Sequence, residues 1–561
     1  MTSSDSDIGR PARPAFLRHM FTPGRSLLAV AIVPLLLVGA AVRLAPLTSD
    51  RRTTAAISED GYLMLTVARN IALGRSLTIA DGTIPTNGVQ PLVTFAWAGL
   101  HWLFDSERLA ALRAVIIVQF AVALVTALFV ALLARDAFRD QAWRDSGALL
   151  AASLWFASPL ALSHTSNGLE TGPYVCAIAA ILLIDLRWRA RSALRAAVLG
   201  AILGLLFLVR NDAVFFILAF LLAALRGNGQ AGQERNGDPG PLRRRLGHAT
   251  IIAAAALAVA SPWLMYNARV FGHIVPVSGR AQNLNLEIGE SLVAVPHGLA
   301  EYAWMVTPLP ERLAGGWLWA LVTSIVLVGV VAATIRRGRH AGMTLRRWMA
   351  ILLVHSALLA AYYGVFFGAA YFLPRYLFPL SLIAVLLPII WVMPPARPSR
   401  IERSTGTRGG VPMAAGLTLL VMIAAGRFHA RSAVHDHAQV VQWVSEHLTP
   451  DTWVGAPQSG TLGYFHDRTI NLDGKVNPLA LQARRDNRLF QYIVDDTTIE
   501  YIADWYGLAR WLDRPETVQE ERDADLLRRH FAVIVRDPER NLVVLRRLEG
   551  LSARPKQIPS P

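Results

Sequence analysis

The sequence Glu59-Asp60-Gly61-Tyr62 marks the point where the first long apolar run of the chain gives way to a polar segment. That run, from Leu27 to Leu47, has about 20 residues, the length that a helix needs to cross a bilayer. It is longer than the apolar part of a usual signal peptide, and more apolar runs follow it. We therefore expect a retained membrane helix, with the acid pair placed where that helix meets water.

The composition indicates many such helices. Hydrophobic residues make up 53% of the 561 residues, charged residues make up 17%, and the mean hydropathy is +0.37. A soluble chain rarely has this profile, so we predict a multi-pass α-helical membrane protein. The net charge of +15 does not indicate a nucleic-acid partner, because the arginines form short clusters between apolar runs, where they act as topology signals. Cys176 is the sole cysteine, which excludes an intrachain disulfide and a cysteine-based metal site.

The short segment from Val89 to Phe104 decides the topology, because it contains Pro91 and His101 and is ambiguous as a span. If it is interfacial or re-entrant, the arginine-rich loops all fall on the cytoplasmic side, as the positive-inside rule requires. This gives about eleven membrane helices, with a cytoplasmic N-terminus and an outer C-terminus. The eleven apolar ranges are 27–47, 107–134, 147–163, 172–186, 194–210, 213–226, 248–268, 316–335, 347–367, 376–393 and 411–426.

We divide the chain into a cytoplasmic tail (1–25), a membrane domain (26–426) whose first outer loop is 48–106, and an extracytoplasmic domain (427–561). The last part has the composition of a soluble domain. It combines an amphipathic helix with short β-like runs at 452–455, 469–472, 531–536 and 542–545, which predicts a small α/β domain. Residues 227–241 predict a disordered cytoplasmic linker. The Arg- and Ala-rich composition is typical of a bacterium with a GC-rich genome, and hence the inner (plasma) membrane is expected.

The polar residues on the outer side can support group transfer. A carboxylate that faces water can act as a general base toward an acceptor hydroxyl. A second carboxylate, with or without a divalent cation such as Mg²⁺, Mn²⁺ or Ca²⁺, could bind the donor. A sugar donor carried on a lipid phosphate leaves the phosphate as an anion, which requires cations more than an acid. The outer candidates for phosphate binding are Arg210 with Asp212, Arg280 and Arg375.

Several motifs, in their order along the chain, resemble bacterial GT-C fold glycosyltransferases. The resemblance is to enzymes that use polyprenyl-phosphate sugars and are related to arabinofuranosyl- and mannosyltransferases, and it extends from about residue 25 to about residue 545. The motifs are Glu59-Asp60-Gly61-Tyr62, 67–74, Pro85-Thr86-Asn87-Gly88 with 89–92, 166–171, Val209-Arg210-Asn211-Asp212, 271–278, Pro374-Arg375-Tyr376, 460–465 and Asn471-Leu472-Asp473-Gly474-Lys475-Val476-Asn477-Pro478.

The resemblance implies an enzyme that moves a sugar from a polyprenyl-phosphate donor to a hydroxyl of an envelope glycan, lipid or protein, at the outer face and with inversion. It implies a catalytic role for Asp60, with Glu59 as its neighbour, although many relatives carry two aspartates there. It also implies that Glu170, with Asp60, contributes to a metal or donor-phosphate site. The candidates for acceptor or sugar binding are Tyr62, Asn87 and Asn167.

Each signal also has a structural alternative. Ser58 could cap a helix whose first turn contains Glu59 and Asp60, both of which would then complement the helix dipole. Glu170 could simply precede a helix that begins at Thr171. A secondary transporter or a flippase for envelope glycolipid precursors would also have about eleven spans. Against a carrier stand the absence of an internal sequence repeat and the large soluble domain expected outside.

Overall fold

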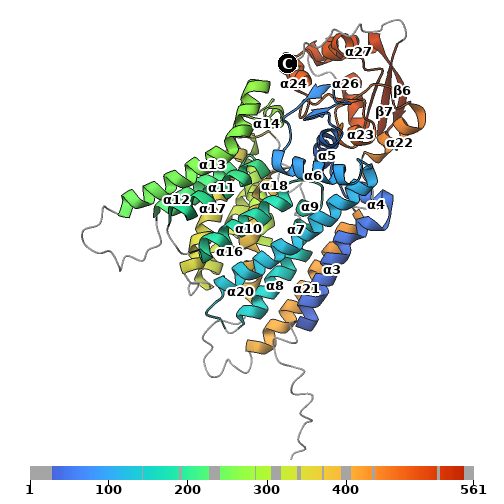
Figure 1. The fold of residues 1–561 in the computed structure, drawn as a ribbon. Helices are drawn as coiled ribbons and strands as arrows, with labels where there is room; N and C mark the ends of the chain where they lie inside the picture. Colours follow the sequence, from blue (N-terminus) through green and yellow to red (C-terminus); the bar gives the residue numbers. More distant parts are fainter. Residues whose placement is uncertain are drawn as a thin grey trace, which may run out of the picture.

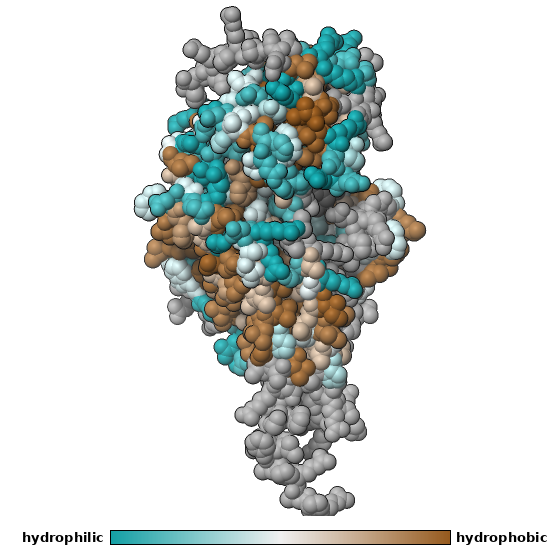
Figure 2. Space-filling view, turned by 90° about the vertical axis from the view of Figure 1, so that its right-hand side faces the viewer, coloured by the Kyte–Doolittle hydropathy of each residue, from teal (hydrophilic) through white to brown (hydrophobic). Residues whose placement is uncertain are grey.

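The protein consists of a helical bundle with a mixed α/β domain at one end (Figure 1). Apolar side chains cover much of the bundle in the view of Figure 2, whereas hydrophilic side chains gather at the end of the molecule that carries the α/β domain. The predicted tail 1–25 and linker residues 227–240 lie outside the described part of the chain. The computed structural model describes residues 28–141, 143–188, 192–226, 241–284, 286–304, 317–337, 343–368, 372–392, 406–431, 435, 437–513 and 518–548.

Helices occupy all eleven predicted apolar ranges, which confirms a multi-pass membrane protein. Six described helices are long and apolar enough to cross a membrane, and one bent pair makes up to seven. The predicted number of eleven spans stays a prediction. The helices of the bundle are α3 (Val33–Leu44), α7 (Arg108–Ala137), α8 (Arg144–Ala157), α9 (Pro159–Thr165), α10 (Thr171–Arg187), α11 (Ala193–Val209), α12 (Ala213–Arg226), α13 (Pro241–Phe271), α16 (Trp317–Arg337), α17 (Met343–Phe366), α18 (Leu373–Leu377), α19 (Ser381–Ala384), α20 (Leu386–Val392) and α21 (Gly406–Arg431).

A proline bends one of the predicted spans, and a second span is divided into several short helical elements. Helices α8 and α9 meet at 57°, because Ser158 precedes Pro159 and takes an extended backbone, with φ −58° and ψ 130°. The range predicted at 376–393 is likewise divided into α18, the 3₁₀ turn η6 (Phe378–Leu380), α19 and α20. Such breaks place polar loop residues near the apolar bundle.

The first outer loop folds into short elements between the bundle and the α/β domain (Figure 1). It contains η2 (Ala45–Thr48), α4 (Asp50–Ala55), α5 (Glu59–Ala72), the antiparallel pair β1 (Thr78–Ile79) and β2 (Ile84–Pro85), and α6 (Pro91–Leu103). Helix α6 has 13 residues, too short for a bilayer, and Trp102 at its end is 74% exposed. This geometry agrees with an interfacial segment.

The C-terminal domain is built on one five-stranded sheet with the order β4-β3-β5-β7-β6. Strands β3, β4 and β5 are parallel, whereas β7 pairs antiparallel with β5 and β6. Four strands match the predicted runs, but β5 was missed. Helix α21 continues to Arg431, five residues past the predicted boundary. The elements are α22 (Ala438–His447), β3 (Val454–Ala456), α23 (Gly460–Phe465), β4 (Thr469–Asn471), α24 (Pro478–Arg485), β5 (Tyr501–Asp504), η8 (Tyr506–Ala509), α26 (Arg510–Asp513), α27 (Val518–His530), β6 (Phe531–Asp537) and β7 (Leu542–Arg547).

Ion pairs connect the C-terminal domain with helices α5 and α7. Asp467, which follows α23, accepts from Arg69 of α5 at 2.6 Å and from Arg108 of α7 at 2.8 Å. Arg108 also donates to the carbonyl of Tyr464, whose hydroxyl donates back to the Arg108 carbonyl. Helices α5 and α23 pack directly on each other. The N-terminus of α5, with its two acids, is thereby fixed between the two parts of the protein.

Candidate active site

Asp60 lies where three distant parts of the chain meet. Ser58 caps α5 by accepting from the Gly61 amide at 3.1 Å, so Asp60 occupies the first helical turn. Arg375 of α18 donates to the Asp60 Oδ2 at 3.0 Å, and the Lys475 ammonium of the C-terminal domain lies 3.6 Å from Oδ1. The side chains of Asp60, Arg375 and Lys475 are 21%, 16% and 19% exposed, so a ligand from outside can reach them.

The charges around Asp60 determine its protonation. Burial favours the neutral form of this carboxyl, but Lys475 and Arg375 together outweigh burial and lower its pKa below the ordinary value. Asp60 is therefore an ionised carboxylate at neutral pH. While both cations remain on it, it is a weak base.

Lys475 was not among the predicted site residues. Lys475 and Lys556 are the only lysines in a sequence otherwise rich in arginine, and Lys475 belongs to the conspicuous Asn471 to Pro478 motif. Its amide donates to the Asp473 Oδ1 at 2.8 Å, and its ammonium lies 3.6 Å from the Asp473 Oδ2. A Cβ on Gly88 would lie 2.2 Å from the Lys475 carbonyl, so the polar turn 85–88 packs closely against this residue. The isolated lysine within this motif is the sequence feature from which Lys475 could have been predicted as a site residue.

A second charged group lies beside the first. Arg210, at the end of α11, is 1% exposed and lies 2.8 Å from Asp212 and 3.9 Å from Glu170. Tyr363 of α17 donates to the same Asp212 oxygen that Arg210 contacts, Oδ2, at 3.2 Å. An Arg210 donor lies 3.4 Å from the Arg375 carbonyl, which joins the two groups. The structure thus brings together predicted residues from four separate segments.

Several polar atoms of this site have no hydrogen-bond partner among the described residues. They are buried, and they belong to neighbouring residues: Asn211 Oδ1, Asp212 Oδ1 and Arg375 Nε. Buried donors and acceptors are usually paired, so a cluster of unpaired ones indicates a place for water or a polar ligand. Aromatic rings line it, because the Arg210 guanidinium lies 4.6 Å from the ring centre of Tyr376 and 5.1 Å from that of Tyr174.

Glu59 points elsewhere. Its carboxylate accepts from the amides of Gly460 and Thr461 and from the Thr461 hydroxyl, the last two at 3.0 and 2.5 Å. A Cβ on Gly460 would lie 2.1 Å from the Glu59 carbonyl, which shows how closely the two helices approach. Glu59 therefore joins α5 to α23, and its oxygens are already engaged.

We expect Glu59→Ala to loosen the contact between the two parts of the protein. The amides of Gly460 and Thr461 would lose their acceptor, at a cost of about 1–3 kcal/mol for each buried group left unpaired. Hydrogen exchange of these two amides should become at least about tenfold faster, since about 1.4 kcal/mol is a factor of ten. Glu446→Ala, on the exposed face of α22, is the control and should leave them unchanged. Equal exchange in the two variants would contradict the joining role.

Two of the residues predicted to bind a sugar are buried in the protein. Tyr62 is fully buried, donates to the Thr54 carbonyl and packs against His435 and Tyr464, so it has no face left for a sugar. Asn87 is also fully buried, and its amide group bonds to Asn267 and to the Val277 amide. Both residues are structural in this arrangement.

Asn167 and Arg280 also lie outside the charged cluster. The Asn167 carbonyl accepts from Ser58, and its side chain accepts from the Leu169 amide, so it shapes the loop that supports the start of α5. Arg280 lies on α14 (Val277–Gln282), which packs on α24 near Arg485. No described contact brings Arg280 to Asp60 or Arg210.

The predicted metal site does not fit these donors. Both oxygens of Asp60 face protein cations, and Glu170 and Asp212 face Arg210. Among the described residues, no group of three or more His, Cys, Asp or Glu side chains is arranged to hold an ion. Glu170 precedes α10 and does not cap it with its side chain. Arginine and lysine side chains thus stand where Mg²⁺, Mn²⁺ or Ca²⁺ was expected.

Comparison with known proteins supports the architecture. Residues 427–542 match a domain of unknown function (DUF8728). No curated protein matches the chain in sequence. ArnT from Cupriavidus metallidurans bound to undecaprenyl phosphate is 13% identical, with a TM-score of 0.54 over 94% of this chain and 99% of that one.

ArnT in the apo state gives a TM-score of 0.53 with the same identity and coverage. The Archaeoglobus fulgidus oligosaccharyltransferase is 13% identical with a TM-score of 0.48, over 90% of this chain and 72% of that one. The likeness to ArnT confirms the predicted GT-C fold.

Proposed function

We propose that this GT-C fold protein is a glycosyltransferase that moves a sugar from a polyprenyl-phosphate donor to an acceptor hydroxyl at the outer face of a bacterial inner membrane. One observation carries the proposal. The buried, unpaired Nε of Arg375 and the neighbouring Arg210 guanidinium lie beside an ionised Asp60, at the junction of the membrane bundle and the C-terminal domain. A phosphate and a nearby hydroxyl are the ligands that such a combination suits.

The cations serve the donor. A polyprenyl phosphate sugar carries a negative phosphodiester, and the phosphate gains charge when the sugar leaves. Arg375 and Lys475 are within reach of solvent and can exchange Asp60 for phosphate oxygens. Arg210 is fixed by Asp212 and Glu170 and supplies a third positive charge that does not have to move. Preorganised charge of this kind stabilises a leaving group in the transition state.

Donor binding also activates the base. When Arg375 and Lys475 turn toward the phosphate, the charges that lower the pKa of Asp60 are shared with the donor, and the carboxylate becomes more basic. The acceptor oxygen then attacks the anomeric carbon while the bond from that carbon to the phosphate oxygen breaks. The hydroxyl proton passes to Asp60, and polyprenyl phosphate leaves as an anion. A single displacement of this kind inverts the anomeric configuration.

The remaining residues have supporting roles in this proposal. Glu59 keeps α5 and α23 together, so that Lys475 stays near Asp60. The lipid tail of the donor requires an apolar entry from the bilayer, which accounts for the large membrane domain. The N-terminus is placed in the cytoplasm and the C-terminal domain outside, on the strength of the arginine-rich loops.

The proposal can be tested with the purified protein in liposomes that contain radiolabelled polyprenyl-phosphate sugars and an envelope glycan extract. A transferase cleaves the bond between sugar and phosphate, so the label should move from the lipid to the glycan and free polyprenyl phosphate should appear. A flippase or transporter would move the lipid or solute and leave that bond intact. Loss of the protein from cells should correspondingly raise one lipid-linked sugar and remove one sugar from an envelope product. An intact donor in the liposomes under all conditions would overturn the proposal.

A further inference from the structure

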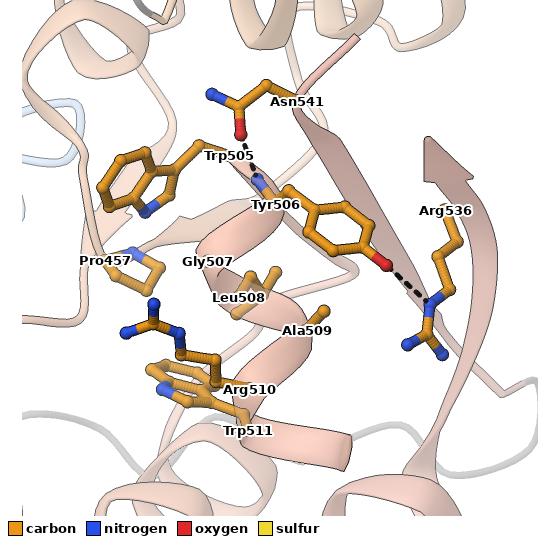
Figure 3. Close-up of a pocket in the computed structure, with 10 residues that line it drawn as sticks. All are labelled: Pro457, Trp505, Tyr506, Gly507, Leu508, Ala509, Arg510, Trp511, Arg536 and Asn541. Carbon is orange, nitrogen blue, oxygen red and sulfur yellow. Dashed lines mark hydrogen bonds between the residues drawn. The ribbon is translucent and has the colours of Figure 1, made fainter. Parts of the chain in front are cut away.

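The C-terminal domain has a cavity of about 780 Å³ that the proposed reaction does not use (Figure 3). It lies past the carboxyl ends of β3 and β5, because Pro457 follows β3 and the residues from Trp505 to Trp511 follow β5. Arg536 and Asn541 complete the lining. The volume is within the roughly 300–1,000 Å³ typical of ligand sites.

The position of this cavity in the sheet is the one that ligands favour in α/β domains. Strand β3 leads through α23 to β4 on one side, whereas β5 leads through α26 and α27 to β6 at the opposite edge. The chain therefore leaves these two parallel neighbours in opposite directions, which opens a crevice between their carboxyl ends. Asp504 stiffens that crevice, since its two oxygens accept from the amides of Gln458 and Trp505 at 2.7 Å.

The aromatic side chains of the lining are fixed and accessible. Trp505 is 42% exposed, and a Cβ on Gly507 would lie 2.9 Å from its indole nitrogen, so its ring lies close against the turn. Trp511 is held by Phe490, with ring centres 5.0 Å apart. In Figure 3 the two indoles lie on the same side of η8, with Pro457 and Arg510 near them. Exposed indole faces can stack on the C–H face of a sugar ring.

Polar groups with several donors also line the cavity, Arg510 beside the indoles and Arg536 on the other side of η8 in the view of Figure 3. The Arg536 Nε lies 3.5 Å from the Tyr506 hydroxyl, and Asn541 accepts from the Tyr506 amide at 3.0 Å, as Figure 3 shows. Arg510 is exposed, and no ion pair engages it in the part of the chain that the structure describes. Planar guanidinium and amide groups suit the closely spaced hydroxyls of a sugar and, in an acidic sugar, its carboxylate.

A nucleotide or free phosphate fits this crevice less well. In α/β domains these ligands sit on the N-terminus of the helix that follows a strand. Here that helix is α23, whose first amides already bind the Glu59 carboxylate. The remaining recognition elements are aromatic faces and hydroxyl-binding groups.

A series of ring contacts connects the cavity with the proposed active site. The ring centre of Trp505 lies 5.7 Å from that of His437, which lies 5.8 Å from that of His435. His435 in turn contacts the ring of Tyr62 at 5.5 Å, two residues after Asp60. Three successive ring contacts thus link the lining of the cavity to α5, the helix that contains Asp60.

We propose that this cavity binds a saccharide segment of the acceptor, which makes the acceptor an envelope glycan rather than a lipid or a protein. The identification of the bound saccharide as acceptor rests on the proposed function, whereas the binding itself does not. The two arginines make acidic saccharides the preferred ligands.

The test uses the full-length protein in detergent on an array of neutral and acidic microbial polysaccharides, with an unglycosylated envelope peptide as a further probe. We expect binding to at least one polysaccharide, at least about tenfold weaker in Trp505→Ala and in Arg510→Ala. Trp102→Ala is the matched control, because Trp102 is an exposed indole outside the cavity. Binding to no polysaccharide, equal binding by all variants, or tighter binding to the peptide would overturn the proposal.

Two further measurements separate this proposal from the transferase assignment. The melting temperature of each variant shows whether it folds, and Arg510 is an exposed residue whose loss should leave folding intact. Asp60→Asn should bind the same polysaccharide as the wild type, because the cavity does not include Asp60. Polysaccharide binding with no transfer by the wild type would reject the enzyme and keep the binding site. If sugar is transferred to a glycan, and the cavity variants use that glycan as efficiently as the wild type, the cavity is not the acceptor site.

Discussion

Replacing Asp60 by asparagine is expected to slow sugar transfer by about 10²- to 10⁴-fold, the usual contribution of a general base. Asparagine has nearly the same shape, but it cannot take the proton of the acceptor hydroxyl. The effect should appear in kcat more than in KM, because the donor phosphate is bound by Arg375 and Lys475 in the proposal. Liposomes with labelled donor, assayed at saturating acceptor, give both constants.

Asp473→Asn is the matched control for Asp60→Asn. Asp473 is also a carboxylate 3.6 Å from the Lys475 ammonium, and its side chain is 16% exposed. Each of the two substitutions therefore removes one negative charge that neighbours Lys475. Asparagine at 473 can still accept from the Lys475 amide. We expect Asp473→Asn to keep most of the rate and both variants to elute as folded protein in size-exclusion chromatography. Equal rates for Asp60→Asn and the wild type would remove Asp60 from the catalytic role.

The pH dependence gives a second check on the same residue. Since the cations hold the pKa of Asp60 below the ordinary value, the free enzyme should keep its base ionised down to acidic pH. The acid limb of kcat/KM should therefore lie below about 3.9, the reference pKa of aspartate. A limb above this value would indicate that another group is the base. Asp60→Asn should lack the limb altogether.

The fold was largely predictable because it depends on local apolar patterns. Each predicted apolar range forms a helix, and the acid pair occupies the first turn of a helix capped by Ser58, as the structural alternative had it. Strand β5 was missed because it has four residues and its neighbours β3 and β7 lie roughly forty residues away in each direction along the chain. The sequence around it carries no alternation that would mark a strand.

The site was predictable by residue type and position, but not by partner. Arg210, Asp212 and Arg375 were found as charged residues at the ends of apolar runs, and the structure places them together. The burial of Tyr62 was not predictable, because the surroundings of a helical side chain depend on what packs against the helix, which here is α23. Lys475 was missed for the same reason. Contacts between the bundle and the C-terminal domain are not encoded in any local pattern.

Replacing Arg210 by methionine is expected to destabilise the protein by about 3–5 kcal/mol, the usual cost of removing one partner from a buried ion pair. Methionine fills much of the space, but Asp212 and Glu170, with side chains 7% and 8% exposed, would remain as two negative charges at the edge of the bundle. Thermal unfolding in detergent, followed by intrinsic fluorescence, measures the loss. Arg135→Met is the control, because its ion pair with Asp145 is exposed and worth at most about 1 kcal/mol.

A second substitution can show whether Arg210→Met destabilises the protein through uncompensated charge or through lost packing. If the uncompensated carboxylates cause the loss, neutralising one of them should restore part of the stability. Arg210→Met with Asp212→Asn should then be more stable than Arg210→Met alone, although Asp212→Asn by itself should destabilise the protein by weakening its pair with Arg210. Additive losses in the double variant would mean that Arg210 contributes by packing against Tyr174 and Tyr376 instead. In that case the donor phosphate would have to rely on Arg375 and Lys475, and the third cation of the proposed mechanism would be structural.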